Sequence, residues 1–347
     1  MNKSLSILVF LAVLAVAASY WVQLTEVVPQ ADKAPLLPAL NTQANDITQI
    51  ELSNASGVLF EAKRINDQWL ATVQDDRGQV IGHYPVAKDK LGALVLALAE
   101  ARQIEAKTAK KTNYHRLGVQ DLTATDSLAT LVSLRSDKLS WQVLVGNHAA
   151  VGNGSYVRLP QNKQAWLVDK NLELPLTNNA WLKQPVLPFE DVAFSKIARV
   201  DQTPWLIQRA NDKAQFTLAS MAPDSQLKYG GVLEAMAINL ASLNFDELIT
   251  PQTLQWNNFT DTVELDVTTF YGHSFTAQLA KDNDKVYMRF SSALTKDYWL
   301  QWIYVISIFS AEQLDKTQND FLMQAQDDKP DSIIPSTRAV DEGESPF

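Results

Sequence analysis

The segment Asp46-Ile47-Thr48-Gln49-Ile50-Glu51-Leu52 alternates apolar and polar residues, as a β-strand with one buried face does. The segment Lys196-Ile197-Ala198-Arg199-Val200-Asp201 shows the same alternation about 150 residues later. Two further strand-like segments and an amphipathic helical segment follow each of them, and more strands come after each helix. The pattern predicts an α+β fold of mostly antiparallel β-structure with an internal duplication of two strand-strand-strand-helix-strands units.

The matched segments keep one order in the two halves. They are 58–64 and 205–209, 68–73 and 215–218, the helices around Leu91, Leu94 and Leu98 and around Leu233, Met236 and Leu240, then 129–134 and 262–267, 156–159 and 287–290, and 166–168 and 302–304. A longer connection in the first half, around residues 107–128, accounts for most of the change in their offset. Coincidence is the alternative, because any antiparallel α+β chain yields some strand–helix–strand matches.

The composition of the chain excludes several classes of protein. Its 347 residues are 46% hydrophobic and 20% charged, which is typical of globular proteins. The net charge of −9 argues against nucleic acid as a partner. Because cysteine is absent, disulfides, thiolate metal sites and cysteine nucleophiles are excluded. No Gly-Lys-Ser or Gly-Lys-Thr phosphate loop occurs, so we expect no nucleotide partner.

The N-terminus predicts a single membrane anchor. Lys3 precedes an uncharged run from Ser4 to Leu24, which spans roughly 30 Å as a helix and so matches a bilayer core. A lysine on the short flank predicts a cytoplasmic N-terminus and a body outside the cytoplasm. A cleaved signal peptide ending at Ala15-Val16-Ala17 is the alternative. The anchor residues that we single out are Leu5, Leu11, Leu14 and Trp21.

Composition also predicts the order of segments along the chain. We expect a cytoplasmic tip and anchor (1–26), a proline-containing spacer (27–45), a first α+β unit with its linker (46–194), a second unit with a C-terminal helix (195–326) and an acidic disordered tail (327–347). The run Tyr298–Phe309 predicts a buried strand. Ser310 and Gln313 predict a capping box for a last helix, Ala311–Met323.

The sequence offers little chemistry. The four histidines are scattered and form no zinc motif, and Ser155 is expected in a hairpin turn rather than as a nucleophile. We therefore predict no catalytic, cofactor-binding or metal-binding residues. Tyr156 and Arg158 in one half, and Tyr287 and Arg289 in the other, are candidate partner-binding residues, because residues two apart on a strand share a face. The alternative is an arginine stacked on an aromatic ring of a solvated face.

Several short motifs occur together in a recognisable order. They are Tyr84-Pro85-Val86, Arg116-Leu117-Gly118-Val119, Leu144-Val145-Gly146-Asn147, Gly154-Ser155-Tyr156-Val157-Arg158, Ala165-Trp166-Leu167-Val168-Asp169 and Ala180-Trp181-Leu182-Lys183. With the N-terminal apolar run and the strand at 47–52, this order resembles a bacterial family known as domain of unknown function 4340. The resemblance implies an inner-membrane anchor and a periplasmic body. It also implies an association with ABC transporter components of the gliding-motility type, and it defines no catalytic residue.

These features together predict a non-enzymatic, membrane-anchored periplasmic protein. We expect it to be an accessory subunit of an ABC-type transporter, with integral membrane subunits and the lipid bilayer as its partners. The alternative is a cell-envelope binding module for a glycan, peptide or lipid. A third hypothesis is an envelope hydrolase with dispersed carboxylates.

Overall fold

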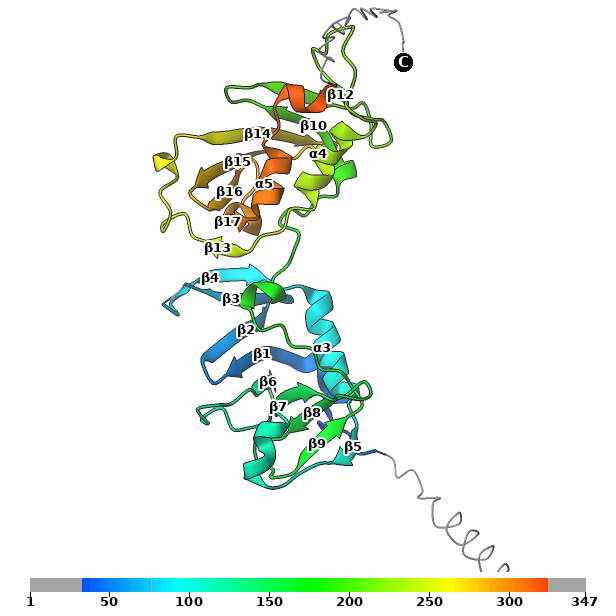
Figure 1. Cartoon of the computed structure of the whole chain (residues 1–347), viewed down its shortest axis with the longest axis vertical. Helices are drawn as coiled ribbons and strands as arrows, with labels where there is room; N and C mark the ends of the chain where they lie inside the picture. Colours follow the sequence, from blue (N-terminus) through cyan, green and yellow to red (C-terminus); the bar gives the residue numbers. More distant parts are fainter. Residues whose placement is uncertain (1–32, 76, 324–347) are drawn as a thin grey trace, which may run out of the picture. The chain divides into compact units, whose positions relative to one another are not determined.

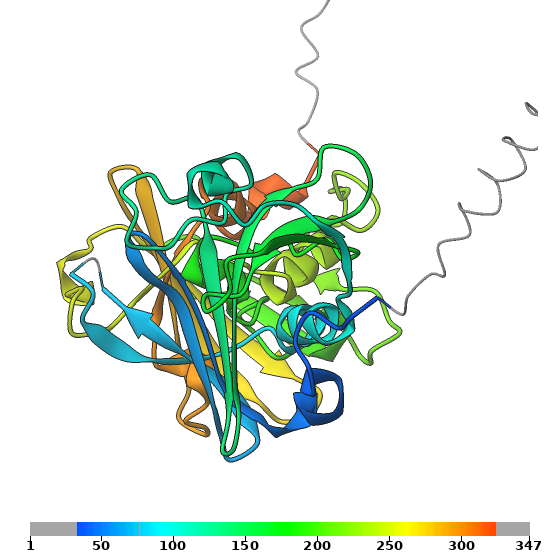
Figure 2. The ribbon, with the colours of Figure 1, turned by 90° about the horizontal axis from the view of Figure 1, so that it is seen from below.

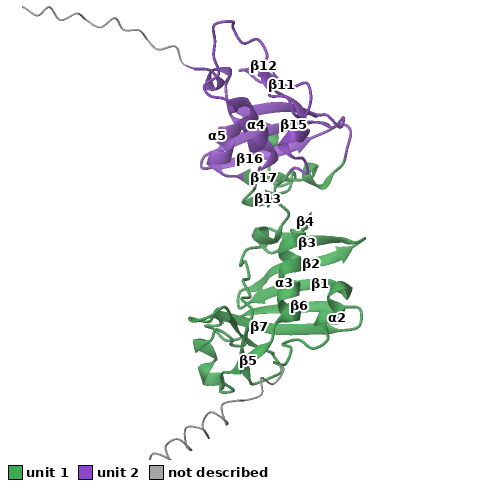
Figure 3. Cartoon of the chain, turned by 90° about the vertical axis from the view of Figure 1, so that its right-hand side faces the viewer, with its two compact units in different colours: residues 1–186, 244–256, 296–305 green, residues 187–243, 257–295, 306–347 purple. Residues whose placement is uncertain are grey.

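The computed structural model describes residues 33–75 and 77–323, which form two compact units. The first contains residues up to 186 together with 244–256 and 296–305, and the second contains 187–243, 257–295 and the residues from 306 onward (Figure 3). The predicted anchor residues Leu5, Leu11, Leu14 and Trp21 lie outside the described residues, as does the predicted acidic tail. In the described part no helix is both long and apolar enough to cross a membrane.

Among the described residues, the first sheet has nine strands in the order β4-β3-β2-β1-β6-β7-β8-β9-β5 (Figure 1). All of its pairings are antiparallel. Its strands are β1 (Ile47–Asn54), β2 (Gly57–Ile65), β3 (Gln68–Gln74), β4 (Val80–Pro85), β5 (Gln103–Ala106), β6 (Thr130–Ser136), β7 (Ser140–His148), β8 (Ser155–Arg158) and β9 (Ala165–Val168). The short helices α2 (Leu40–Gln43) and η1 (Ala44–Asp46) precede it, and η2 (Lys111–Arg116) and η3 (Asn178–Trp181) lie in its connections.

The helix α3 (Lys88–Glu100) lies beside the strands of this sheet (Figure 1, Figure 2). Its buried stripe is Leu91, Leu94 and Leu98, at the spacing that places side chains on one helix face. The inward residues of the strands, such as Ile50 and Val132, are equally buried. Because the helix and the sheet each have one apolar face, burial of the two faces against each other is the main source of stability.

Among the described residues, the second sheet has eight strands in the order β12-β11-β10-β14-β15-β16-β17-β13. They are β10 (Phe194–Arg199), β11 (Trp205–Gln208), β12 (Thr217–Leu218), β13 (Glu247–Ile249), β14 (Thr262–Thr269), β15 (Ser274–Asp282), β16 (Lys285–Ser291) and β17 (Ile303–Ile306). The helices of this half are η4 (Asp191–Ala193), α4 (Val232–Ala241), η5 (Trp256–Asn258), η6 (Tyr298–Leu300), α5 (Ile308–Leu314) and η7 (Gln318–Phe321). The predicted α+β class with mostly antiparallel strands is therefore confirmed.

The strand orders of the two sheets correspond position by position once β4 is set aside. From here on, the first unit denotes residues 35–186, which carry the first sheet, and the second unit denotes residues 187–323, which carry the second sheet with β13 and β17. In both sheets the first strand of the unit, β1 or β10, pairs with β6 or β14, and the strand directly after the helix, β5 or β13, lies at the far edge. Along the chain, the helix α3 or α4 comes before this edge strand. The buried residues Leu91, Leu94 and Leu98 of α3 have the same spacing as Leu233, Met236 and Leu240 of α4. The segments matched in the sequence thus occupy matching positions in the two sheets. The internal duplication itself stays a prediction.

A β-bulge occurs at the same place in the two sheets. It lies between Ile47 and Gln49 in β1 and between Phe194 and Lys196 in β10, in each case opposite the end of the neighbouring strand. The extra residue carries a hydroxyl in both sheets. Thr48 Oγ1 donates to the carbonyl of Arg135 at 3.4 Å, and Ser195 Oγ donates to the carbonyl of Thr268 at 3.0 Å. Because a bulge interrupts the regular ladder, its recurrence is a specific likeness between the two units.

The end of each unit is tied back to the residues before its helix. In the first unit the N–H of Ala87 donates to Trp181 O (2.8 Å), and the N–H of Lys183 donates to Pro85 O (2.8 Å). In the second, the N–H of Lys228 donates to Phe321 O (2.8 Å) and that of Met323 donates to Gln226 O (2.9 Å). Both returning segments contain a short 3₁₀-helix that follows a threonine and ends in an aromatic residue and a leucine, Thr177–Leu182 and Thr317–Leu322.

The aromatic residue of each returning segment packs on an aromatic residue of the second strand. Trp181 stacks on Phe60, with ring centroids 5.1 Å apart, and Phe321 meets Trp205 edge-on, also at 5.1 Å. One unit therefore has tryptophan on the turn and phenylalanine on the strand, and the other has the reverse. Each pair fills its part of the core with one large and one smaller ring, which keeps the packed volume similar.

The C-terminal helix differs from the prediction. The helix α5 is Ile308–Leu314 rather than Ala311–Met323, and its N-cap is Ser307 rather than Ser310. Ser307 Oγ accepts the N–H of Ser310 at 3.0 Å, so Ser310 lies inside the first turn. The predicted buried strand is limited to β17, and α5 begins two residues after β17 ends because Ser307 provides a cap immediately after the strand.

We expect Ser307→Ala to lower the free energy of unfolding by about 1 kcal/mol, because the N–H of Ser310 loses its acceptor. Urea denaturation followed by circular dichroism measures this change. Ser310→Ala is the matched control and should cost less than about 0.5 kcal/mol, since its own N–H keeps its bond to Ser307. Equal losses in the two variants would contradict the assignment of the cap.

Candidate functional site

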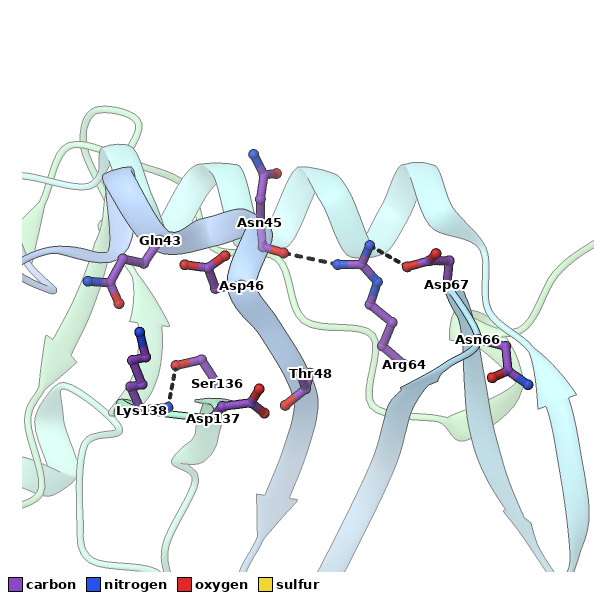
Figure 4. A pocket seen from close by; sticks show the side chains of 10 residues that line it. All are labelled: Gln43, Asn45, Asp46, Thr48, Arg64, Asn66, Asp67, Ser136, Asp137 and Lys138. Carbon is purple, nitrogen blue, oxygen red and sulfur yellow. Dashed lines mark hydrogen bonds and ion pairs between the residues drawn. The ribbon is translucent and has the colours of Figure 1, made fainter.

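A polar cavity of about 600 Å³ lies at one end of the first sheet (Figure 4). Three segments meet there: the η1 turn before β1, the β2–β3 turn and the β6–β7 turn. Its described lining residues are all polar: Gln43, Asn45, Asp46, Thr48, Arg64, Asn66, Asp67, Ser136, Asp137 and Lys138. Amides, hydroxyls, carboxylates and two cations therefore face one space, a lining suited to binding a polar molecule by hydrogen bonds.

Arg64 is held in place at the edge of this cavity. Its guanidinium donates to the carbonyl of Asn45 at 3.0 Å and to the carboxylate of Asp67 at 2.9 Å (Figure 4). The side chains of Arg64 and Asp67 are 38% and 88% exposed, so this ion pair contributes little to stability. Its effect is to fix the direction of the guanidinium, which an anionic or hydroxyl-bearing ligand can use.

The corresponding arginine of the second unit, Arg209, is half-buried, and its guanidinium is hydrogen-bonded and stacked. Arg209 donates to the carbonyls of Phe194 and Asp191, 2.8 and 2.6 Å away. The ring of Phe216 lies 4.4 Å from its guanidinium carbon, and the ring of Phe270 lies 5.9 Å away. Phe270 directly follows β14, as the exposed Asp137 directly follows β6. The first unit thus has an open polar cavity around Arg64, whereas in the second unit aromatic rings lie near the corresponding Arg209.

A second polar feature is a row of side chains that crosses six strands of the first sheet. Strand register places these residues side by side on one face: Gln142 (β7), Ser133 (β6), Glu51 (β1), Glu61 (β2), Thr72 (β3) and His83 (β4). Burial opposes ionisation of Glu61, but hydrogen bonds from Lys63 and Thr72 and the charge of Lys63 outweigh it, so its pKa lies below the ordinary value. Glu61 is therefore an anion at neutral pH, and the row is a hydrogen-bonding surface.

The structure places the candidate residue Arg158 inside the first unit, where its side chain is only 3% exposed. Its Nε donates to Val119 O (3.0 Å), one terminal nitrogen donates to the carbonyls of Pro160 and Asn162, and the other pairs with Asp121. Its guanidinium carbon lies 4.5 Å from the centre of the Tyr114 ring. The contacts to Lys111 and Arg158 hold the pKa of Asp121 below its usual value.

The connection at 107–128 explains this burial. It supplies Tyr114, Val119 and Asp121, and Tyr156 packs against the cluster that Tyr114 and Val119 form. The structure thus brings Tyr156 and Arg158 together under one segment, with the guanidinium of Arg158 hydrogen-bonded inside the unit. Their predicted role in binding a partner stays a prediction.

Arg289 and Tyr287 lie on β16 in a different setting. Arg289 Nε donates to Gln278 Oε1 at 2.7 Å, and Gln278 in turn donates to Glu264 at 2.6 Å, which forms a ladder across β16, β15 and β14. Burial lowers the pKa of Arg289, and the charge of Glu264 opposes this. Tyr287 is buried and lies 5.6 Å from the ring of Phe259. Of the two arginines, Arg289 is the more exposed.

Sequence reasoning missed a charged network at the end of the second unit. Arg199 is bound by Asp201 at 2.8 Å and by Asp315 at 3.0 Å, and Lys281 joins Asp315 at 2.8 Å. Burial raises the pKa of Asp201, but hydrogen bonds from Arg199 and from the N–H groups of Thr203 and Glu264 outweigh it and lower the pKa. This network anchors the chain after α5. Only the Arg199–Asp201 spacing was visible in the sequence.

His148 Nδ1 lies within hydrogen-bonding distance of Ser155 Oγ, at 3.3 Å. Ser155 is fully buried, and its Oγ accepts the N–H of Leu172 at 2.9 Å. Within the described ranges no group of three or more His, Cys, Asp or Glu side chains is arranged to hold a metal ion.

Residues 82–261, just over half of the chain, match the family described as Domain of unknown function (DUF4340). The chain belongs to this family. The match spans the end of the first sheet's β4, the helix α3, the returning segment of the first unit and the start of the second sheet. No curated protein and no solved structure matches the chain.

We expect Arg158→Met to lower the free energy of unfolding by about 2–3 kcal/mol, because buried carbonyls and Asp121 lose a charged donor. Urea denaturation measures the loss. Arg289→Met is the matched control at the other tyrosine–arginine pair and should cost less, since Arg289 is less buried. A larger loss for Arg289→Met would refute this ranking.

Proposed function

We propose that this protein is a non-enzymatic, membrane-anchored periplasmic subunit that works with an ABC-type transporter. The observation that carries the proposal is the uncharged apolar run Ser4–Leu24 ahead of a two-unit β-rich body. A transmembrane helix there would place the body on the outer side of the bacterial inner membrane, with Lys3 in the cytoplasm. Membership of the family supports the proposal through the context that the resemblance implies, and ATP hydrolysis would belong to another chain.

The anchor also carries a feature suited to a membrane partner. Ala12, Ala15 and Ala18 lie at three-residue spacing, so a helix would present them close together. Small residues allow close packing of helices in lipid, where van der Waals contact drives association. Integral membrane subunits of the transporter are therefore the proposed partners, together with the lipid bilayer.

A cell-envelope binding module is the second candidate function, and the polar cavity of the first unit favours it. The cavity of about 600 Å³ has an oriented guanidinium, Arg64, beside amide, hydroxyl and carboxylate groups. This lining suits a glycan or a polar peptide better than a lipid tail, because hydroxyl and amide groups of the ligand would find both donors and acceptors.

We also infer that the two units arose by internal duplication. The shared strand order, the bulge at Thr48 and Ser195, and the returning segments that end in Trp181 and Phe321 support this inference. Superposing residues 46–170 on 195–305 should overlay the matched strands and the helix in the same order, and failure of these elements to overlay would contradict the inference.

The test of the transporter proposal is recovery of a partner. Tagged full-length protein, expressed at native level and solubilised in mild detergent, should bring down an ABC permease. Replacing residues 4–24 with an unrelated membrane anchor should weaken this recovery, because the helix contacts in lipid are lost. Recovery of the protein alone after gentle crosslinking would count against the proposal and favour the binding module.

Topology is the control for this experiment. A reporter that fluoresces only in the cytoplasm, fused at Phe347, should stay dark in the native protein and in the anchor replacement. Strong fluorescence of the native fusion would overturn the periplasmic placement, whatever the co-purification shows.

A further inference from the structure

The two units have corresponding grooves beside their helices. In the first unit the groove is lined by α3 residues Lys90, Ala93, Leu94 and Ala97 and by Trp181 of the returning segment. In the second unit the α4 residues Val232, Ala235, Met236 and Asn239 and the returning Phe321 line a cavity in the same way. The helix positions have identical spacing, and each aromatic residue ends a 3₁₀-helix, so the two spaces are structural counterparts.

The two grooves differ in how much space is left. The groove of the first unit measures about 450 Å³, whereas that of the second measures about 90 Å³. In the second unit α5 packs against α4 (Figure 1). Gln313 of α5 and Lys316, two residues after α5, line the small cavity that is left. Ala311 and Leu314, one turn apart on α5, are fully buried. A short helix therefore fills this place in the second unit.

The first unit does not form that helix from its own chain. The segment between β9 and the returning turn is 169–176, two residues shorter than its counterpart 307–316. It contains Pro175, which removes a backbone donor and disfavours a helix. Its Leu172 is tied down by the bond from its N–H to Ser155 Oγ. The segment stays irregular, and the groove between it and α3 stays open.

The charges at the rim of the open groove favour a basic occupant. The ammonium group of Lys90 is already bound by the carbonyl of Ala180 at 2.8 Å. Glu173 is exposed and lines the groove, and its carboxylate accepts a hydrogen bond from the amide of Asn171, 2.9 Å away. The rim therefore offers a carboxylate, and in the second unit Lys316 stands beside the corresponding space.

We infer that the groove between α3 and residues 171–181 is a docking site for a short amphipathic α-helix of another protein. That helix places a small and an aliphatic residue, spaced like Ala311 and Leu314, against Leu94, Ala97 and Trp181. A lysine or arginine near its C-terminal end faces Glu173. This inference does not depend on the partner being a transporter subunit.

The first test uses the second unit's own helix as the probe. A fluorescent peptide of residues 306–316, held helical by a lactam between Glu312 and an Ile308→Lys substitution, is titrated with the full-length protein in detergent. Positions 308 and 312 are exposed in α5, so the bridge leaves the docking face free. We expect saturable binding by fluorescence anisotropy, and a peptide with Leu314→Glu should bind at least about tenfold more weakly.

Variants of the full-length protein locate the binding. Ala97→Trp should fill the groove and weaken binding at least about tenfold. Leu96→Trp is the matched control, because Leu96 is exposed on the same helix outside the groove lining, and it should leave the affinity unchanged. Glu173→Lys, which alters only an exposed side chain, should weaken binding about threefold. Absence of saturable binding, or equal effects of Ala97→Trp and Leu96→Trp, would overturn the inference.

The second test identifies the occupant in cells. A photoreactive benzoylphenylalanine at position 97 should crosslink a helical segment of another protein, whereas the same group at position 96 should not. An adduct formed only with this chain itself would overturn the assignment to a partner. An adduct with a helical segment of a protein other than a transporter subunit would support the groove assignment, while the transporter proposal is tested by the co-purification through residues 4–24, so the two can fail separately.

Discussion

Each unit depends on a pair of backbone hydrogen bonds that ties its last segment to the residues before its helix. The bonds of Ala87 and Lys183 in the first unit, and of Lys228 and Met323 in the second, hold the returning segment against the residues that precede the helix. They also bring Trp181 and Phe321 beneath the helix, where each ring meets an aromatic partner on the sheet. Without this closure neither the core under the helix nor the groove beside it would be defined.

The same framework carries different surfaces in the two units. At the strand ends, Asp137 and its neighbours leave a polar cavity around Arg64, whereas Phe270 and Phe216 cover Arg209. Beside the helix, the irregular 169–176 segment leaves a groove, whereas α5 fills its counterpart. In both places residues of the second unit itself, Phe216 and Phe270 or the helix α5, occupy space that is left open in the first unit. These two open places are the ones where we propose that the first unit binds other molecules.

Much of the fold could be predicted from the sequence, because the alternation of apolar and polar residues is a local signal. The segments around Ile47–Leu52, Lys196–Arg199 and Leu91–Leu98 are strands and a helix as expected. The helix start was misplaced because Ser307 and Ser310 are equally good caps by composition, and only the end of β17 decides between them. Neighbouring secondary structure, rather than residue type, selects the cap.

The sites were beyond the reach of sequence patterns because they depend on distant segments. The burial of Arg158 requires the 107–128 connection to cover it, and no local pattern around Tyr156 indicates that cover. The Arg64 cavity joins three turns that are far apart in the chain. The groove is recognised as a candidate docking site only when α3 is compared with α4, because α5 packs beside α4 and the first unit has no helix in the corresponding position.

The reversed aromatic pairs have a consequence for how this core can change. A single exchange in the first unit, Phe60→Trp, would set two indoles against each other, and Trp181→Phe would leave two smaller rings and a void. Each single step is unfavourable, while the two exchanges together restore the arrangement seen at Trp205 and Phe321. The free-energy effects of such substitutions are therefore strongly non-additive. The two positions are constrained to vary together, and the first unit can reach the arrangement of the second only by a coupled change.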